Sequence, residues 1–342
     1  MRHRPILIWL AALATLVLAM VFVGGLTRMT GSGLSMVGWQ PISGVIPPVS
    51  QEDWVREFTA YQASPQFKRV NFWMELADFK RIFYWEYGHR VLGRLVGLVF
   101  IFPFIFFAVS KLLPQGYFGR FLLAFILGGC QGLLGWYMVK SGLVDQPHVS
   151  HLRLAAHLSL ALFLFCYLFW LGLSLSGSRK YSGGKLTTVL ARTLLVVVSL
   201  QIVYGAFAAG LNAGLVYNTF PLMNGYIVPP GVMALKPELI NLFNNPVTVQ
   251  WIHRGGAGLI FIAALLLAIC LCLRSGLSPR SLKPLRYSSL LLLMLVGAQA
   301  ALGVFVLLWR VPIALASAHQ MGACAILGVT LFINYKIGSA RA

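Results

Sequence analysis

The stretch Glu86-Tyr87-Gly88-His89-Arg90 opens an apolar run long enough to cross a membrane, and Gln250-Trp251-Ile252-His253-Arg254 opens a second such run. The two stretches lie 164 residues apart and read almost alike. A later apolar run in each half of the chain carries a second histidine, His157 and then His319. Because ionisable groups within lipid are costly and usually functional, the two histidine pairs predict two metal-centred sites built on one plan.

The composition places the chain among polytopic membrane proteins. Hydrophobic residues make up 58% of the 342 residues and charged residues 10%, and the mean hydropathy is +0.80. Eight apolar runs each approach the ~20 residues that span a bilayer as a helix. They lie near Pro5–Leu26, Glu86–Lys111, Gly119–Val139, Ser150–Leu173, Leu186–Gly210, Gln250–Leu273, Ser288–Leu308 and Pro312–Asn334. We therefore predict an all-α membrane protein with eight transmembrane helices.

The net charge of +19 does not indicate nucleic-acid binding, because the basic residues lie between the predicted spans and at the termini, as they do in membrane proteins that follow the positive-inside rule. An even number of spans puts both termini on one side, and the positive-inside rule makes that side the cytoplasm. The residues placed inside are Arg2, Arg4, Lys111, Arg120, Arg179, Lys180, Lys185, Arg274, Arg280, Lys283, Arg286 and Lys336. The long segment 27–83 then lies outside, and the histidines lie towards the outer face.

The chain reads as a tandem repeat that divides near residue 180. Gly129-Cys130-Gln131-Gly132-Leu133-Leu134-Gly135 matches Gly297-Ala298-Gln299-Ala300-Ala301-Leu302-Gly303. Each half contains four predicted spans, so both halves insert in one orientation. We predict two four-helix bundles related by a pseudo-two-fold axis, over residues 1–180 (the first half, with the outer loop 27–83) and 181–342 (the second half).

All five cysteines lie inside predicted spans, which argues against a structural disulfide: Cys130, Cys166, Cys270, Cys272 and Cys324.

The missing ligands narrow the choice of metal. Apart from Glu86 the spans lack carboxylates, so a di-iron cluster has no ligands, and zinc requires a third or fourth donor. Two facing histidines fit the axial positions of a haem iron. Four arginines are candidates for binding haem propionates, with anchoring to lipid headgroups as the alternative. They are Arg90, Arg254, Arg94 and Arg153.

Glycines on two of the histidine-bearing spans also fit this interpretation, because a flat macrocycle can approach a helix backbone that lacks side chains. Close helix packing explains them equally well. They are Gly88, Gly93, Gly97, Gly255, Gly256 and Gly258.

The chain resembles the haem A synthase family. The resemblance is carried by Glu86-x-x-His89-Arg90, by Thr27-Arg28-Met29-Thr30-Gly31-Ser32-Gly33-Leu34-Ser35 and by Asn218-Thr219-Phe220-Pro221-Leu222-Met223, and it runs from about Leu18 to Val329. It implies oxidation of the C8 methyl group of haem O to the formyl group of haem A, for use in terminal oxidases. It also implies that His89 and His157 hold the substrate haem while His253 and His319 hold haem b.

The two halves differ at one telling position, because Glu86 in the first half corresponds to Gln250 in the second. Glu86 and His89 share a helix face, so the carboxylate can reach the edge of a porphyrin bound by His89. There it is expected to accept a proton or to stabilise a developing cationic carbon. The competing interpretation is that Glu86 favours a helix N-terminus through the dipole.

Some members of the resembled family have a cysteine pair in an outer loop, which this chain lacks. The resemblance is therefore to the subtype of Gram-negative bacteria and mitochondria, and the short amino terminus favours the bacterial inner membrane.

The implied partners are haem O as substrate, haem O synthase upstream, an unidentified electron acceptor or donor, and the lipid bilayer. The oligomeric state is left open, with a homo-oligomer among the alternatives.

Two other functions use the same pattern. A dihaem b-type electron-transfer protein, such as a quinol oxidoreductase subunit, would use the four histidines but give no role to Glu86. A transporter is also compatible with parallel repeats, but it predicts polar residues in broken helices at the midplane.

Overall fold

The structure is a computed structural model that describes residues 3–38, 43–144, 146–177, 181, 184–273 and 279–337. Within these ranges, eight helices are long and apolar enough to cross a membrane. They are α1 (Arg4–Met29), α3 (Leu76–Val109), α4 (Phe118–Lys140), α5 (His151–Leu175), α6 (Lys185–Gly210), α8 (Pro246–Leu273), α9 (Pro279–Leu308) and α10 (Ile313–Lys336). The predicted fold class is confirmed, and the chain is a multi-pass membrane protein. Arg2, Arg179, Lys180 and Arg274 lie outside the described residues, as does the side chain of Arg280.

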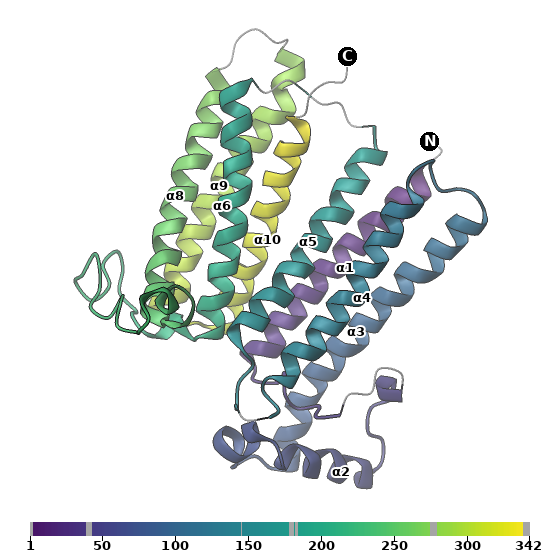
Figure 1. Cartoon of the computed structure of the whole chain (residues 1–342), viewed down its shortest axis with the longest axis vertical. Coiled ribbons are helices and arrows are strands. Elements are labelled where there is room, and N and C mark those ends of the chain that lie inside the picture. Colours follow the sequence, from purple (N-terminus) through teal and green to yellow (C-terminus); the bar gives the residue numbers. More distant parts are fainter. Residues whose placement is uncertain are drawn as a thin grey trace. The chain divides into compact units, whose positions relative to one another are not determined.

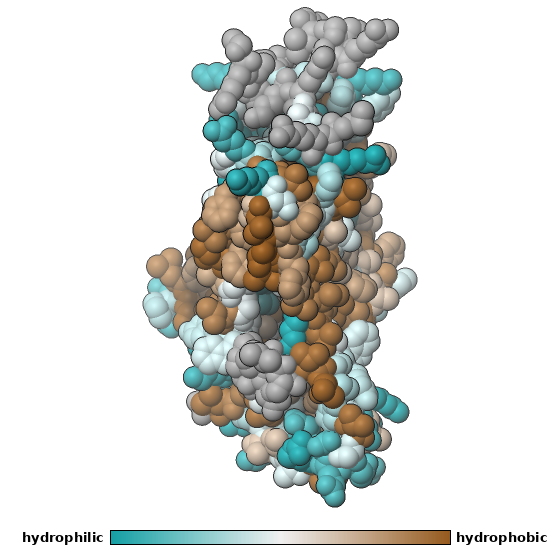
Figure 2. All heavy atoms as spheres, turned by 90° about the vertical axis from the view of Figure 1, so that its right-hand side faces the viewer, coloured by the Kyte–Doolittle hydropathy of each residue, from teal (hydrophilic) through white to brown (hydrophobic). Residues whose placement is uncertain are grey.

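Helices are the expected solution for these runs, because lipid offers no partner for an unpaired backbone amide. Their outward faces are apolar: Phe102 is 67% exposed and Leu133 66% exposed. Figure 2 shows hydrophobic side chains gathered over the middle of the face in view, between hydrophilic ones above and below. Such a surface suits lipid tails rather than water.

The chain divides into two compact units, Met1–Leu10 with Cys166–Ala342, and Ala11–Phe165. In the first of these, α6 contacts α8 and α10, and α9 also contacts both α8 and α10. These four helices run side by side (Figure 1). The pseudo-symmetric pair of four-helix bundles with its boundary at residue 180 stays a prediction.

In the unit Ala11–Phe165, α3 contacts α4, and the short helix α2 (Gln51–Gln62) contacts α3 near its beginning (Figure 1). Helix α2 begins with a capping box in which Ser50 and Asp53 exchange hydrogen bonds. Hydrogen bonds from Ser50, and a further one from Arg56, lower the pKa of the Asp53 carboxyl. The segment 27–83 therefore contains ordered helical structure rather than loop alone.

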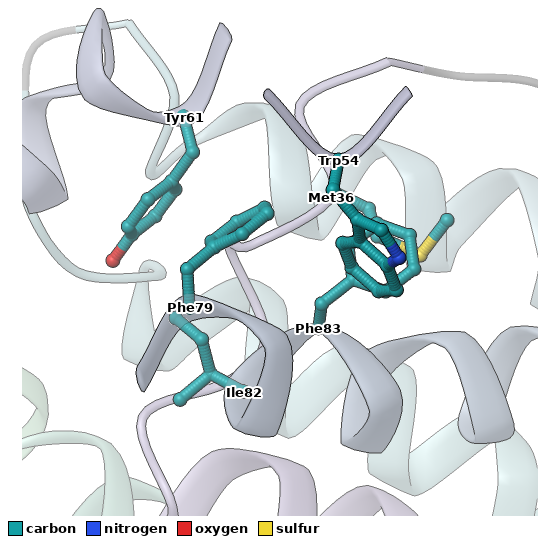
Figure 3. Close-up of a cluster of buried hydrophobic side chains, with 6 residues drawn as sticks. All are labelled: Met36, Trp54, Tyr61, Phe79, Ile82 and Phe83. Carbon is teal, nitrogen blue, oxygen red and sulfur yellow. The ribbon is translucent and has the colours of Figure 1, made fainter. Parts of the chain in front are cut away.

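Helix α3 begins ten residues before Glu86, earlier than the apolar run alone predicts. The cause is tertiary packing: Phe79, Ile82 and Phe83 on its first turns are buried against Trp54 and Tyr61 of α2 (Figure 3). Phe79 stacks on Tyr61 with ring centroids 5.2 Å apart. This aromatic cluster carries the helix beyond the length that spanning requires.

The turns after the first span of each half share a backbone conformation. Gly31 after α1 has φ +67°, and Asn212 after α6 has φ +51°. Glycine and asparagine are the residues that most readily adopt this left-handed conformation. The matched turns indicate that the repeat extends to the backbone of the connecting segments.

We expect Phe79→Ala to lower the free energy of unfolding by about 3 to 5 kcal/mol, because it empties the centre of the aromatic cluster. Thermal unfolding of the purified protein in detergent, followed by near-ultraviolet circular dichroism, measures the effect. The matched control is Phe72→Ala, since Phe72 is 69% exposed. Equal stability of the two variants would show that the cluster does not hold α2 on α3.

Candidate functional site

The four predicted histidines lie on four different membrane-spanning helices: His89 on α3, His157 on α5, His253 on α8 and His319 on α10. Three of them lie six or seven residues after their helix begins, but His89 lies thirteen residues after Leu76. The predicted span near Glu86–Lys111 puts His89 within the first turn of its helix, and this is corrected, because packing on α2 makes α3 begin at Leu76. Each histidine is partly buried.

The two histidines of the second half face one another at a distance that suits a shared metal ion. The ring centroids of His253 and His319 are 6.4 Å apart and the ring planes are 74° apart. Two metal–nitrogen bonds of about 2 Å each, together with the ring radii, separate the centroids of two axial imidazoles by about 6 to 6.5 Å. In the first half, His89 and His157 lie within electrostatic range of each other.

Each histidine ring packs against a glycine of a neighbouring helix. A Cβ atom added at Gly24 would lie 3.1 Å from the His89 ring, and one at Gly135 would lie 2.9 Å from the His157 ring. The corresponding distances are 3.2 Å from Gly205 to His253 and 2.8 Å from Gly303 to His319. Only glycine leaves room for these rings without displacing them.

Glutamines four residues before three of these glycines brace the same helix pairs. The side-chain amide of Gln131 donates to the His157 carbonyl at 3.1 Å. Gln201 and Gln299 donate likewise to the carbonyls of His253 and His319, each at 2.7 Å. The position four residues before Gly24 is Met20, which cannot donate a hydrogen bond, so His89 lacks this brace.

The histidine sites fit a haem better than a metal held by protein alone. Among the described residues, no group of three or more His, Cys, Asp or Glu side chains lies together. The Nδ1 atoms of His157, His253 and His319 are buried and have no hydrogen-bond partner in the described part of the chain. Two-histidine sites with glycine on the flanking helix suit a group that supplies its own equatorial nitrogens.

Glu86 is the most strongly bound side chain beside these histidines, and only 3% of it is exposed. One carboxylate oxygen, Oε1, accepts from Arg90 Nη2 at 2.6 Å and from Arg90 Nε at 3.1 Å. The other, Oε2, accepts from the Ser35 hydroxyl and from the Met36 amide, each at 2.8 Å. A guanidinium and two further donors thus balance the buried charge and fix the carboxylate in one position. Because Glu86 lies ten residues into α3, a role at the helix N-terminus is excluded.

Arg90 and Arg254 clamp the segment that follows the first span of their half. Arg90 donates to the carbonyls of Met36 and Gly38. Arg254 donates to the carbonyls of Tyr217 and Thr219 through the corresponding Nη atoms. Both arginines were predicted to bind propionates; the structure gives each of them a backbone-binding role, and propionate binding stays a prediction.

The second half replaces the buried ion pair with neutral hydrogen bonding. Gln250 is 4% exposed, and its amide donates to the Tyr217 carbonyl at 3.0 Å. Its Oε1 atom is buried and has no partner among the described residues. The same clamp therefore folds around either side chain, but only the first half places a carboxylate beside its histidines.

The other two predicted arginines occupy different surroundings. Arg94 lies one turn after Arg90 on α3. Arg153 lies one turn before His157 on α5, donates to the Tyr137 carbonyl at 2.8 Å and stacks on the Tyr137 ring at 3.7 Å. Arg153 thus lies close to His157, a predicted axial ligand of the haem iron.

Sequence reasoning missed the glycines that contact the histidines and favoured glycines on the histidine helices themselves. A Cβ atom at Gly88, Gly97, Gly255 or Gly258 would meet nothing within 4 Å, whereas one at Gly93 would lie 3.5 Å from Met20 and one at Gly256 would lie 2.2 Å from Gln201. None of these six glycines contacts a histidine ring. The missed signal is Gln-x-x-x-Gly, which occurs at 131–135, 201–205 and 299–303. Its spacing puts both side chains on one helix face.

Comparison of the sequence with known proteins identifies one family. The model of the cytochrome oxidase assembly protein family matches residues 7–331. The chain belongs to this family. Curated relatives named heme A synthase include the protein of Nitrosospira multiformis, which is 44% identical over 98% of this chain and 94% of its own length. The protein of Wolbachia pipientis subsp. Culex pipiens is 42% identical over 97% of each chain, and that of Rhizobium meliloti is 44% identical over 96% of this chain and 89% of its own.

We expect hydrogen exchange to detect the clamp that Arg90 forms on the segment after the first span. Arg90→Ala removes both loop contacts and leaves Glu86 without its cation, so backbone amides in 34–38 should exchange faster. Mass spectrometry of the purified protein reports this rate. Arg81→Ala, on the exposed face of the same helix, is the control. Unchanged exchange in Arg90→Ala would mean that the segment is held by other contacts.

Proposed function

We propose that this chain oxidises the C8 methyl group of haem O to the formyl group of haem A. The observation that carries the proposal is the buried Glu86 beside His89, where the equivalent position in the second half is the neutral Gln250. The two histidine sites match except for one ionisable group. The site with the carboxylate is suited to the reaction, and the site without it is suited to a permanently bound cofactor. The names and high coverage of the curated relatives support the same reaction.

In this proposal His89 and His157 hold the substrate haem, and His253 and His319 hold haem b. The 6.4 Å separation of the second pair and the glycine behind every ring support axial ligation. Haem b supplies a redox centre when bound. The protein contributes ring positions that the flanking glycines and the glutamine braces define.

Glu86 acts on the methyl group from a fixed position. Its four donors hold the carboxylate in one position, from which it would reach the edge of a porphyrin bound by His89. Oxidation of a methyl carbon releases protons and develops positive charge, and an anion in a water-poor site stabilises that charge or accepts a proton. Arg90 orients Glu86 and also binds the loop that covers it.

The membrane placement of the proposal follows the charge pattern. The chain lies in a bacterial inner membrane with both termini on the cytoplasmic side. The histidine sites lie within two four-helix bundles, towards the outer side of the membrane. Haem O arrives from haem O synthase. Conversion of its methyl group to a formyl group takes the oxygen atom of water and releases protons and electrons, and an external acceptor removes the electrons. Arg90, Arg94, Arg153 and Arg254 are the side chains proposed for propionates.

The matched histidine geometry also favours a second candidate, a dihaem b-type electron-transfer protein. Such a protein gives no role to Glu86 and contains only haem b. Chromatography of the haems extracted from the purified protein separates the two: haem O or haem A supports the synthase, whereas haem b alone supports the electron carrier.

We expect Glu86→Gln to keep both haem sites loaded but to lower haem A formation by about 100-fold or more, as is usual for loss of a positioned proton acceptor. The variant should fold, because Gln250 already occupies the equivalent clamp. Extracted haems from cells supplied with haem O are quantified by chromatography. The control is Gln250→Glu, which should form haem A normally. Normal haem A formation by Glu86→Gln would remove the role assigned here.

We expect Gly303→Ala to lose at least half of the bound haem b, because the new methyl group would lie 2.8 Å from the His319 ring and must push it aside. Absorption of the reduced pigment measures the haem content. Gly297→Ala on the same helix is the control, since its methyl group would meet Phe261 at an ordinary 3.9 Å. Equal haem content in the two variants would contradict the steric role of Gly303.

A further inference from the structure

A cavity at the end of α4 and the beginning of α5 carries Lys140, which the proposed function leaves unassigned, together with Arg153. Its volume is about 620 Å³, and its lining includes Trp136, Tyr137, Lys140 and Arg153. This size lies within the range of small-molecule pockets. Lys140 and Arg153 are the cations among its described lining residues, and their charge can attract an anion.

Both cations are held over aromatic rings rather than by carboxylates. Lys140 Nζ lies 5.2 Å from the Trp136 ring centroid, and the Arg153 guanidinium lies 3.7 Å from the Tyr137 ring centroid. Arg153 Nη1 also donates to the Tyr137 carbonyl. The rest of the guanidinium fork makes no hydrogen bond within the described residues and is available to a carboxylate.

The cavity adjoins the His157 site. Arg153 precedes His157 by four residues, so both side chains lie on one face of α5. Tyr137 follows Gly135 by two residues, and Gly135 is the glycine against the His157 ring. A flat ligand held by His157 therefore has Arg153 one helical turn away along α5.

The second half lacks this feature. When the halves are matched through Gly135 with Gly303 and through His157 with His319, Lys140 corresponds to Leu308 and Arg153 to Leu315. Two leucines offer nothing to an anion. In the described part of the second half, the cavity at the end of α9 has a single cation, Arg310. The pair Lys140 and Arg153 thus belongs to the half whose haem must be recognised, bound and released at each turnover.

We propose that Lys140 and Arg153 bind the propionate carboxylates of the porphyrin held at His157, and that this cavity is the recognition point for the exchangeable haem. The inference rests on the proposed function, because it requires a haem at His157. The carboxylates form charge-assisted hydrogen bonds with the Arg153 fork and a charge pair with Lys140. The C8 methyl group neighbours one propionate on the macrocycle, so this contact also orients the ring for oxidation.

The test compares haem O with its dimethyl ester, in which the propionates carry no charge. Purified full-length protein that contains its resident haem is titrated with each, and the Soret band of the newly ligated haem gives the Kd. The wild-type protein should bind haem O about tenfold to a hundredfold more tightly than the ester, as expected for one or two charge-assisted hydrogen bonds. Lys140→Leu with Arg153→Leu should abolish that preference while the affinity for the ester stays unchanged. Arg153→Lys should restore part of it.

Several results overturn the proposal. Equal weakening of acid and ester means that the cations support the fold, and an unchanged preference means that the propionates bind elsewhere. Retention of phosphatidylglycerol by the wild-type protein but not by the double variant, with the haem preference intact, assigns the cavity to a lipid headgroup. Arg81→Leu controls for the loss of charge itself. If His157→Ala leaves haem O affinity unchanged, the proposed haem site fails, and this failure is distinct from failure of the cavity.

Discussion

The packing of an imidazole ring against a glycine of the neighbouring helix sets the geometry of both histidine sites. Gly24, Gly135, Gly205 and Gly303 each leave the space that one histidine ring fills. Because a side chain at any of these positions would push the ring away, the helix spacing and the ring position are fixed together. The glutamine amides that bind the carbonyls of His157, His253 and His319 hold three of the helix pairs at the same level. His89 lacks this brace, which makes the glutamate-bearing half the less constrained of the two.

A second constraint joins the helices to the segments that cover them. Arg90 and Arg254 bind backbone carbonyls of the segment after the first span, so each half has a clamp built from corresponding atoms. The two clamps differ at Glu86 and Gln250, and also at Ser35, which donates to Glu86, and Val216, which cannot donate a side-chain hydrogen bond. The carboxylate costs free energy to bury and is compensated by the guanidinium and by the Ser35 and Met36 donors. The second half forms the same clamp around the neutral Gln250, so folding of the clamp does not itself require a carboxylate at this position.

The sequence predicted the eight spans and the helix carrying each histidine because hydropathy and the cost of polar groups in lipid act locally. It placed His89 too near a helix start, because the extension of α3 depends on Phe79 and Phe83 meeting Trp54 and Tyr61. The partners of Arg90 and Arg254 were not predictable, since they are backbone carbonyls distant in the sequence. The glycines behind the rings were predictable in principle from the Gln-x-x-x-Gly spacing, but their partners lie on other helices. The Lys140 and Arg153 cavity required the structure, because the turn between the end of α4 and the beginning of α5 determines how their side chains meet.

The central claim is that one fold occurs twice, with an exchangeable substrate haem in the first half and a resident haem b in the second. Chromatography of extracted haems from two double variants, produced with a haem O supply, tests it most directly. The account predicts that His253→Ala with His319→Ala removes haem b but leaves haem O or haem A bound. It predicts the reverse for His89→Ala with His157→Ala. Loss of the same haems from both variants would contradict the division of the two sites.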